Sequence, residues 1–178
     1  MTGVTDMGRE ELRSRLLAFD RAVALLHPGH SFRLVLVGGG AMVLLGCLAR
    51  ATSDLDVLVF PPELASLMTQ FDLNGRVNAW EDHFACNIED RLVPIDVSTT
   101  AVACYSASLE DLIVSKLHSA RPKDAQDIRR PEVLNAVDWD RLADAVADTE
   151  GSVLIERRHR DFLADYASYR KECGPCAG

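Results

Sequence analysis

Two aspartates spaced two residues apart stand where a metal ion would be needed. Asp54 and Asp56 lie in the segment 51–60, Ala-Thr-Ser-Asp-Leu-Asp-Val-Leu-Val-Phe. Side chains two apart on a strand point to the same face, so these carboxylates repel each other unless a cation lies between them. The apolar residues that follow predict a buried strand, at whose mouth unpaired carboxylates would be unfavourable. Such an oxygen-rich site favours Mg²⁺ or Mn²⁺, which also bind substrate phosphates.

Three consecutive glycines, Gly38, Gly39 and Gly40, follow the apolar run 34–37. A glycine turn between a strand and a helix lets a phosphate approach the backbone, and the first amides of the helix can bind it. The run is not a P-loop, because no Gly-Lys-Ser/Thr follows. It is not a dinucleotide-binding fingerprint either, because Val43 stands where the third glycine would fall. A tight turn packed for structural reasons would also explain these glycines.

Apolar spacing predicts the elements that must position these side chains. Leucines at helical intervals are followed by His27-Pro28-Gly29, which ends the first helix. Proline in a first turn favours a helix that begins at Pro61-Pro62. We expect a helix over 10–26, a strand over 32–37, a helix over 41–48, a strand over 54–60, a helix over 61–71 and a turn at Asn74-Gly75.

A third carboxylate follows in the next segment. Two strand-like runs, 83–88 and 92–97, are joined by Glu89-Asp90-Arg91 and predict a hairpin. Asp96 shares one face of the second run with Leu92 and Pro94. We expect this strand to neighbour the strand 54–60, so that Asp96 faces the other two acids.

The rest of the chain is predicted to be helical. Ser108 with Asp111 three residues later is an N-cap signature. Helices are expected over 108–120, 124–136, 139–148 and 152–170.

This order of elements predicts an α+β fold, with a small mixed β-sheet core flanked by helices and a helical C-terminal extension. We expect an αβ core over 1–107 that includes the N-terminal helix, a helical part over 108–170 packed on that core, and a flexible tail over 171–178. The tail holds Cys173-Gly-Pro-Cys176, which has a thioredoxin-type spacing but lacks the strand and helix that this chemistry needs.

Composition indicates a soluble, cytoplasmic protein. The 178 residues are 48% hydrophobic and 26% charged, as in ordinary globular domains. No apolar run approaches the roughly 20 residues that a membrane span requires, and no membrane partner is expected. The net charge of −8 argues against broad attraction to nucleic acid, although Arg157, Arg158, His159 and Arg160 form a local basic run. This run fits a solvated helix face or a contact with RNA phosphates.

Several of these motifs together resemble the DNA polymerase β-like nucleotidyltransferase superfamily. The resemblance rests on Gly38-Gly-Gly-Ala-Met42, a spacer that carries Arg50, Thr52-Ser-Asp-Leu-Asp56, and Asp96. Glu110-Asp-Leu-Ile-Val-Ser-Lys116 followed by Arg121-Pro-Lys-Asp-Ala-Gln-Asp-Ile128 resembles a Lys…Arg-x-Lys-Asp-x-x-Asp segment of bacterial minimal nucleotidyltransferases, including abortive-infection and toxin–antitoxin members. The resemblance covers about residues 30–130.

The resemblance implies an enzyme that moves a nucleoside monophosphate from a nucleoside triphosphate to a hydroxyl with the help of Mg²⁺ or Mn²⁺. Asp54, Asp56 and Asp96 would hold the metal, and Lys116 would act as a mobile positive charge beside the phosphates. The remaining nucleotide-binding residues would be Gly38, Gly39, Gly40, Ser53, Arg121, Lys123, Asp124 and Asp127.

Alternative interpretations remain open both for Lys116 and its neighbours and for the function of the whole protein. Lys116 fits an exposed helix lysine equally well, and Arg121, Lys123, Asp124 and Asp127 can pair among themselves, with Lys123 and Asp127 one helical turn apart. The acceptor can be RNA, such as a tRNA 3′ end, a protein or a small molecule. RNA would suit a toxin-like activity with a cognate antitoxin or toxin as partner. The alternative is a non-catalytic protein of this fold with a binding or regulatory, antitoxin-like role.

Overall fold

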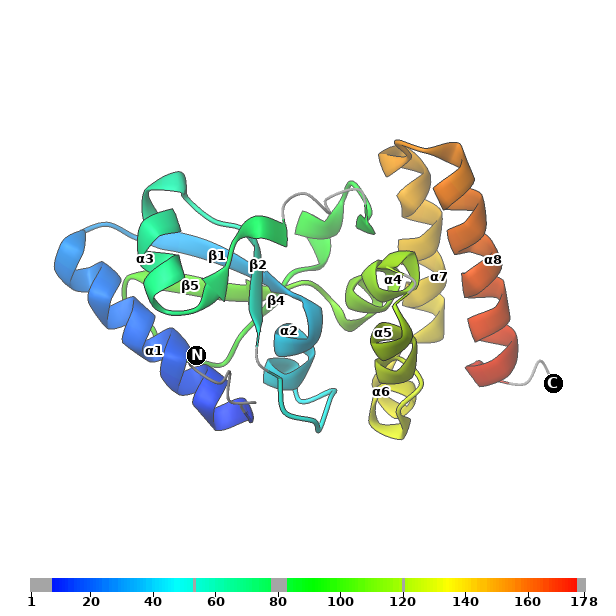
Figure 1. The fold of residues 1–178 in the computed structure, drawn as a ribbon, viewed down its shortest axis with the longest axis horizontal. Helices are drawn as coiled ribbons and strands as arrows, with labels where there is room; N and C mark the ends of the chain where they lie inside the picture. Colours follow the sequence, from blue (N-terminus) through cyan, green and yellow to red (C-terminus); the bar gives the residue numbers. More distant parts are fainter. Residues whose placement is uncertain (1–7, 53, 78–82, 120, 176–178) are drawn as a thin grey trace. The chain divides into compact units, whose positions relative to one another are not determined.

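The computed structural model describes residues 8–52, 54–77, 83–119 and 121–175 (Figure 1). The chain forms two compact units. The N-terminal unit comprises 1–81 and 91–107, and the C-terminal unit comprises 82–90 and 108–178. The segment 82–90 therefore leaves the first unit and belongs to the second.

The N-terminal unit is built on a five-stranded mixed sheet with the strand order β3-β2-β1-β5-β4. β1 lies near the middle, antiparallel to β2 and parallel to β5. β3 runs parallel to β2, and β4 runs antiparallel to β5. A mixed sheet with helices before, between and after its strands in the chain confirms the α+β prediction. The strands are β1 (Phe32–Val37), β2 (Leu55–Val59), β3 (Leu73–Asn74), β4 (Val93–Pro94) and β5 (Val102–Ser106).

Helices of the N-terminal unit bury their apolar faces as the sequence predicts. α1 (Arg9–Leu26) buries one stripe that includes Leu12, Leu16, Phe19 and Val23, which recur at helical spacing. α1 contacts α2 (Gly38–Leu45) and α3 (Ala65–Gln70), and α2 contacts β1 and β2. A short 3₁₀-helix, η1 (Pro62–Leu64), precedes α3.

Two local predictions are wrong, and a third is met in part. The three glycines begin α2 itself rather than forming a separate turn. Asn74 ends β3, and its Oδ1 accepts a hydrogen bond from the Arg76 amide at 3.1 Å, so the predicted turn begins on the last residue of a strand. Residues 83–97, all of which the structure describes, do not form the predicted hairpin. Residues 88–91 form a 3₁₀-helix, η3 (Ile88–Arg91), and β4 pairs with β5 instead. β5 was not predicted, although it is the parallel neighbour of β1.

A buried aspartate fastens α1 to the start of β5. The side chain of Asp20 is 3% exposed, within the apolar stripe of α1. Its oxygens accept hydrogen bonds from the amides of Thr100, Ala101 and Val102 and from the Thr100 hydroxyl, at 2.8–3.1 Å. Burial alone would raise the pKa of Asp20, but these hydrogen bonds outweigh it and hold the pKa below its usual value. The carboxylate is therefore a structural link between a helix and a strand.

Asp20→Asn is expected to lower the free energy of unfolding by about 2 kcal/mol at pH 7, because an amide has one acceptor oxygen and places its NH₂ against amide donors. A folded-state pKa below the unfolded value contributes stability above the unfolded pKa, and that contribution is lost as the pH falls through the folded pKa. The difference between wild type and variant should therefore shrink in acid. Urea unfolding at pH 7 and at pH 3, which lies below the ordinary carboxyl pKa, measures this difference, with the exposed Asp161→Asn as control. An unchanged free energy of unfolding at pH 7 would contradict this role for Asp20.

The C-terminal unit is helical. α4 (Leu109–Ser119) contacts α5, α7 and α8, and is capped by Ser108, whose Oγ accepts a hydrogen bond from the Asp111 amide at 3.1 Å, as predicted. Pro131 begins a new helix, so the predicted helix over 124–136 is two helices. The elements that complete the unit are α5 (Pro122–Asp127), α6 (Pro131–Ala136), α7 (Trp139–Ala147), the 3₁₀-helix η4 (Asp148–Ser152) and α8 (Glu156–Cys173).

α8 extends through Cys173, so three residues of the predicted tail are helical, whereas Cys176 lies outside the described residues. In the part of the chain that the structure describes, no helix combines the length and apolarity needed to cross a membrane.

Candidate functional site

The glycine run lies directly against the Asp54–Asp56 segment. Val37, the last residue of β1, pairs with Asp56, so the chain enters Gly38 beside the Asp56 side chain. A Cβ atom added to Gly38 would lie 2.6 Å from Oδ2 of Asp56, and one added to Gly40 would lie 2.6 Å from the carbonyl oxygen of Asp54. Gly38 also has φ of +71°, in the left-handed region that favours glycine. Any other residue here would fill the space between the turn and the carboxylate.

Asp54 and Asp56 have the same-face placement that their spacing predicts. Leu55 and Val57 are fully buried, whereas Asp54 is exposed and Asp56 is half-buried. The alternation over residues 54–57, which begins one residue before β2, places the two aspartates on the side opposite to Leu55 and Val57. Two carboxylates on one face fit Mg²⁺, which commonly takes one or two carboxylates and completes its shell with waters and phosphates.

Asn74 is a residue of this site that the sequence did not reveal. It pairs with Asp56 across β3 and β2, and its Nδ2 donates a hydrogen bond to Oδ1 of Asp56 at 2.8 Å. The amide thus holds one oxygen of the carboxylate while the other faces Gly38. Asn-Gly is a common turn signal, and this is why the sequence pointed to a turn instead of a strand.

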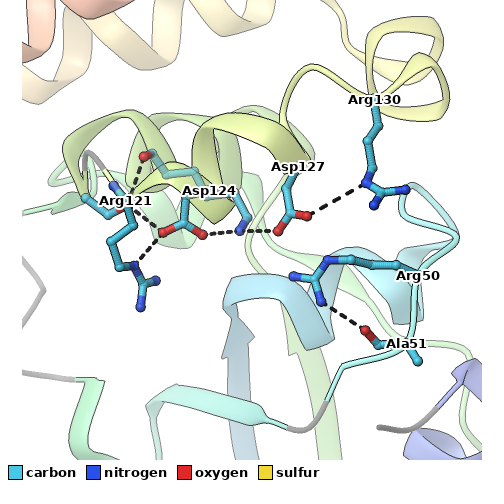
Figure 2. A network of polar contacts seen from close by, with 8 residues as sticks. Arg50, Ala51, Arg121, Asp124, Asp127 and Arg130 are labelled. Atoms are coloured by element: carbon cyan, nitrogen blue, oxygen red, sulfur yellow. Dashed lines mark hydrogen bonds and ion pairs between the residues drawn. The ribbon is translucent and has the colours of Figure 1, made fainter.

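Arg50 brings a positive charge to the same glycine run. A Cβ atom added to Gly39 would lie 3.1 Å from a terminal nitrogen of the Arg50 guanidinium and 3.6 Å from Oγ1 of Thr52. The guanidinium also donates a hydrogen bond to the Ala51 carbonyl at 2.9 Å (Figure 2). A guanidinium beside first-turn amides of a helix is a combination suited to phosphate oxygens. Ser53, predicted to contact phosphates, lies outside the described residues.

Asp96 does not lie on a strand beside β2, and this prediction is wrong. β1 and β5 separate β2 from β4, and Asp96 itself follows the end of β4. Its side chain is 94% exposed and its Oδ2 forms an ion pair with Arg13 of α1 at 2.8 Å. Among the described residues, no group of three or more His, Cys, Asp or Glu side chains is placed to hold a metal ion. The face argument fails because β4 is only Val93–Pro94 and does not reach Asp96, and parity in any case does not determine which strands are neighbours.

Lys116 is buried in the C-terminal unit rather than exposed. Its Nζ lies 2.5 Å from Oδ1 of Asp124 and 3.0 Å from Oδ2 of Asp127, and all three side chains are at most 6% exposed. Arg121 pairs with Asp124 at 2.6 Å, and Arg130 lies 3.9 Å from Asp127 (Figure 2). The internal pairing considered from the sequence is therefore present, with Lys116 at its centre.

Lys123 does not take part as the sequence suggested. It is exposed, and Asp127 is engaged by Lys116 and Arg130 instead. Burial raises the pKa of Asp124, but hydrogen bonds from Lys116 and Ser119 and the charge of Lys116 outweigh it, so the pKa lies below its usual value. Asp124 is therefore a carboxylate at neutral pH, and the ion pair depends on Lys116. A nucleotide-binding role for Lys116, Arg121, Lys123, Asp124 and Asp127 stays a prediction.

Gly38→Ala is expected to lower the free energy of unfolding by about 1–2 kcal/mol, because alanine is strained at a positive φ. It should also weaken binding of a metal–nucleotide complex at least tenfold, because the methyl group takes the space beside Oδ2 of Asp56. Gly29→Ala is the matched control: Gly29 has φ of +78°, but a Cβ there would meet nothing within 4 Å. Thermal unfolding and calorimetric titration of both variants separate the two effects, and equal nucleotide affinities would contradict the site.

Of the comparisons with known proteins, only the one with family models finds a match. No curated protein and no solved structure matches the chain. A family model does match, over residues 14–173, which include the glycine run, Asp54, Asp56 and the Lys116 cluster. The match extends over most of both units, and so the chain belongs to the family described as "Nucleotidyltransferase of unknown function (DUF6036)".

Proposed function

We propose that the protein is an active, Mg²⁺- or Mn²⁺-dependent nucleotidyltransferase that moves a nucleoside monophosphate from a nucleoside triphosphate to a hydroxyl. One observation carries this proposal. The glycine run that opens α2 and the carboxylate of Asp56 are so close that a single methyl group at Gly38 would meet Oδ2 at 2.6 Å. A phosphate-binding turn and a metal-binding carboxylate are the two parts that this chemistry must bring together.

In this proposal each residue has a role that its surroundings support. Asp54 and Asp56 hold the metal ion, and Asn74 fixes the orientation of Asp56 through its hydrogen bond of 2.8 Å. The first-turn amides of α2 and the Arg50 guanidinium bind the phosphates. Asp96 is not part of this site, because two strands separate it from β2.

The reaction forms a bond between the acceptor oxygen and the α-phosphorus and breaks the bond from that phosphorus to the pyrophosphate, which leaves, while the acceptor hydroxyl gives up its proton to solvent. A divalent cation held by Asp54 and Asp56 would neutralise phosphate charge and stabilise the leaving group. The residues of the N-terminal unit position the triphosphate, so that positioning and electrostatic stabilisation account for the catalysis.

We further propose RNA, such as a tRNA 3′ end, as the acceptor, in a toxin-like activity controlled by a cognate protein. Arg157, Arg158 and Arg160 support this, because they are exposed at the start of α8 in a chain with a net charge of −8.

The test is incubation of the protein with each α-labelled nucleoside triphosphate, Mg²⁺, and total RNA or RNA-free cell extract as separate acceptors. We expect label in the RNA fraction, lost with chelator and restored by Mn²⁺. Label in the extract alone would support transfer but overturn the RNA acceptor. No transfer to either fraction by protein that binds nucleotide would favour the non-catalytic, regulatory alternative.

A further inference from the structure

The C-terminal unit contains a hollow of about 40 Å³ that the proposed transferase chemistry does not use. This space can accommodate about three water-sized groups. Segments far apart in the sequence supply its polar lining: His83, α4, η4 and α8. The polar residues are His83, His118, Thr149, Ser152, Arg158 and His159.

The chemistry of this lining is suited to an anion. It combines three imidazoles, one guanidinium and two hydroxyls, and none of the described lining residues carries a carboxylate. The three histidines do not form a metal site, because no such group in the described ranges is placed to hold a metal ion. Arginine and hydroxyl groups beside imidazoles are the usual partners of phosphate oxygens.

His118 provides a second, independent observation. Its ring packs on Phe162, with the ring centroids 3.7 Å apart, and its Nε2 is buried without a hydrogen-bond partner among the residues that the structure describes. Burial first, and then the neighbouring His83 and His159, lower the pKa of His118 to about 4, so this ring is neutral at pH 7. A buried polar atom without a partner is rare in folded proteins and often marks a place completed by a further group.

The rim of the hollow is apolar and exposed. Val153, Leu154 and Ile155 contribute to the lining, and they are 36%, 78% and 48% exposed. An apolar group placed over them would remove this surface from water. The rim therefore suits a ligand that joins an anionic group to an apolar body.

We propose that this hollow is a binding site for a small organic phosphate. The phosphate group contacts Arg158, the imidazoles and the hydroxyls of Thr149 and Ser152, while the apolar part covers the rim of residues 153–155. This inference does not rest on the proposed nucleotidyl transfer, whose metal- and phosphate-binding residues belong to the N-terminal unit, and it shares only Arg158 with the proposed RNA contact.

Nuclear magnetic resonance of the imidazole side chains tests this directly at pH 7. The probes are inorganic phosphate, phenyl phosphate and, as the uncharged control, phenol. His27 and His30 lie outside the hollow and serve as internal references. We expect saturable shifts of His83, His118 and His159 with both phosphates, tighter binding of phenyl phosphate, and no saturable shift with phenol. Absence of saturable shifts at the three histidines, or equal shifts at all five, would overturn the proposal, and equal affinities for the two phosphates would overturn its apolar part.

Arg158→Gln and Arg160→Gln form a matched pair on α8, because both residues are exposed but only Arg158 lines the hollow. Arg158→Gln should weaken phenyl phosphate binding about tenfold, and Arg160→Gln less than about twofold. Equal effects of the two substitutions would mean that the phosphate responds to the general charge of α8, and would contradict a defined site. Both variants keep the buried faces of the helix unchanged, so folding should not obscure the result.

Discussion

Asp56→Asn is expected to lower nucleotidyl transfer by about 10²–10³-fold or more, because it removes a charge that the phosphates and their cation require. Asparagine keeps the size of the side chain and one oxygen that Asn74 can still approach. The free energy of unfolding should therefore change by less than about 1 kcal/mol. Asp54→Asn should have a similar effect on transfer and almost none on stability, since Asp54 is exposed. Initial rates of label transfer at saturating Mg²⁺ measure the effect.

Asp96→Asn is the matched control for this pair. It removes the same charge from the same unit, but from a side chain that is 94% exposed and paired with Arg13. Most of the transfer activity should remain. A loss as large as that of Asp56→Asn would show that Asp96 joins the reacting groups. Transfer undiminished in both Asp54→Asn and Asp56→Asn would refute the metal assignment.

Lys116→Met is expected to destabilise the protein by about 3–5 kcal/mol, because it leaves Asp124 and Asp127 as buried carboxylates without their central cation. Methionine preserves the length and apolar stem of the side chain, so the loss reports the charge. Both interpretations drawn from the sequence, a mobile charge beside phosphates and an exposed helix lysine, leave Lys116 unburied, and for such a residue stability would scarcely change. Chemical unfolding of the nucleotide-free protein distinguishes these outcomes.

The exposed Lys123→Met is the control for Lys116 and should change stability by less than about 0.5 kcal/mol. The pH dependence gives a second check. In wild type the pKa of Asp124 lies below its usual value, so its contribution is present at neutral pH and is lost as the pH falls through the folded pKa. Without Lys116, burial raises the pKa of this carboxyl group, so protonation in mild acid removes the unpaired buried charge and restores part of the variant's free energy of unfolding. A stability gap that stays constant from pH 7 to pH 4 would contradict the ion-pair explanation.

The sequence was sufficient to predict the parts of the site that are close together in the chain. Strand β1 has the predicted limits, Phe32–Val37, because a continuous apolar run followed by glycines leaves few alternatives. Asp54 and Asp56 share a face because alternation is a property of any strand. The glycines meet Asp56 because an antiparallel pair returns the chain beside the end of β1.

What the sequence could not provide was the lateral order of the strands. β5 contains Ala103, Cys104 and Ser106, which carry a weak strand signal, and it was missed. Its insertion beside β1 places β4, and with it Asp96, away from β2. Asn74 was missed for a related reason, since its role depends on pairing between β2 and β3 rather than on its own local pattern.

The burial of charged side chains was the second feature that the sequence did not predict. Asp20 and Lys116 look like ordinary helix-surface residues in the sequence, and only their partners make burial possible. Those partners are backbone amides far along the chain for Asp20 and two aspartates of α5 for Lys116. The pattern of a single sequence shows the faces of a helix. It does not show which polar residue on a face meets a hydrogen-bond or ion-pair partner from another part of the chain.

Paramagnetic broadening by Mn²⁺, added with a non-hydrolysable nucleoside triphosphate, tests the central claim most directly. The measurement locates the cation on the polypeptide without requiring turnover or a known acceptor. We predict that the amide signals of Gly38, Gly39, Gly40, Asp54, Asp56 and Asn74 broaden first, and that the broadening requires the nucleotide and is lost in Asp56→Asn. Broadening centred on Asp96, or none at the glycine run, would contradict the site proposed here.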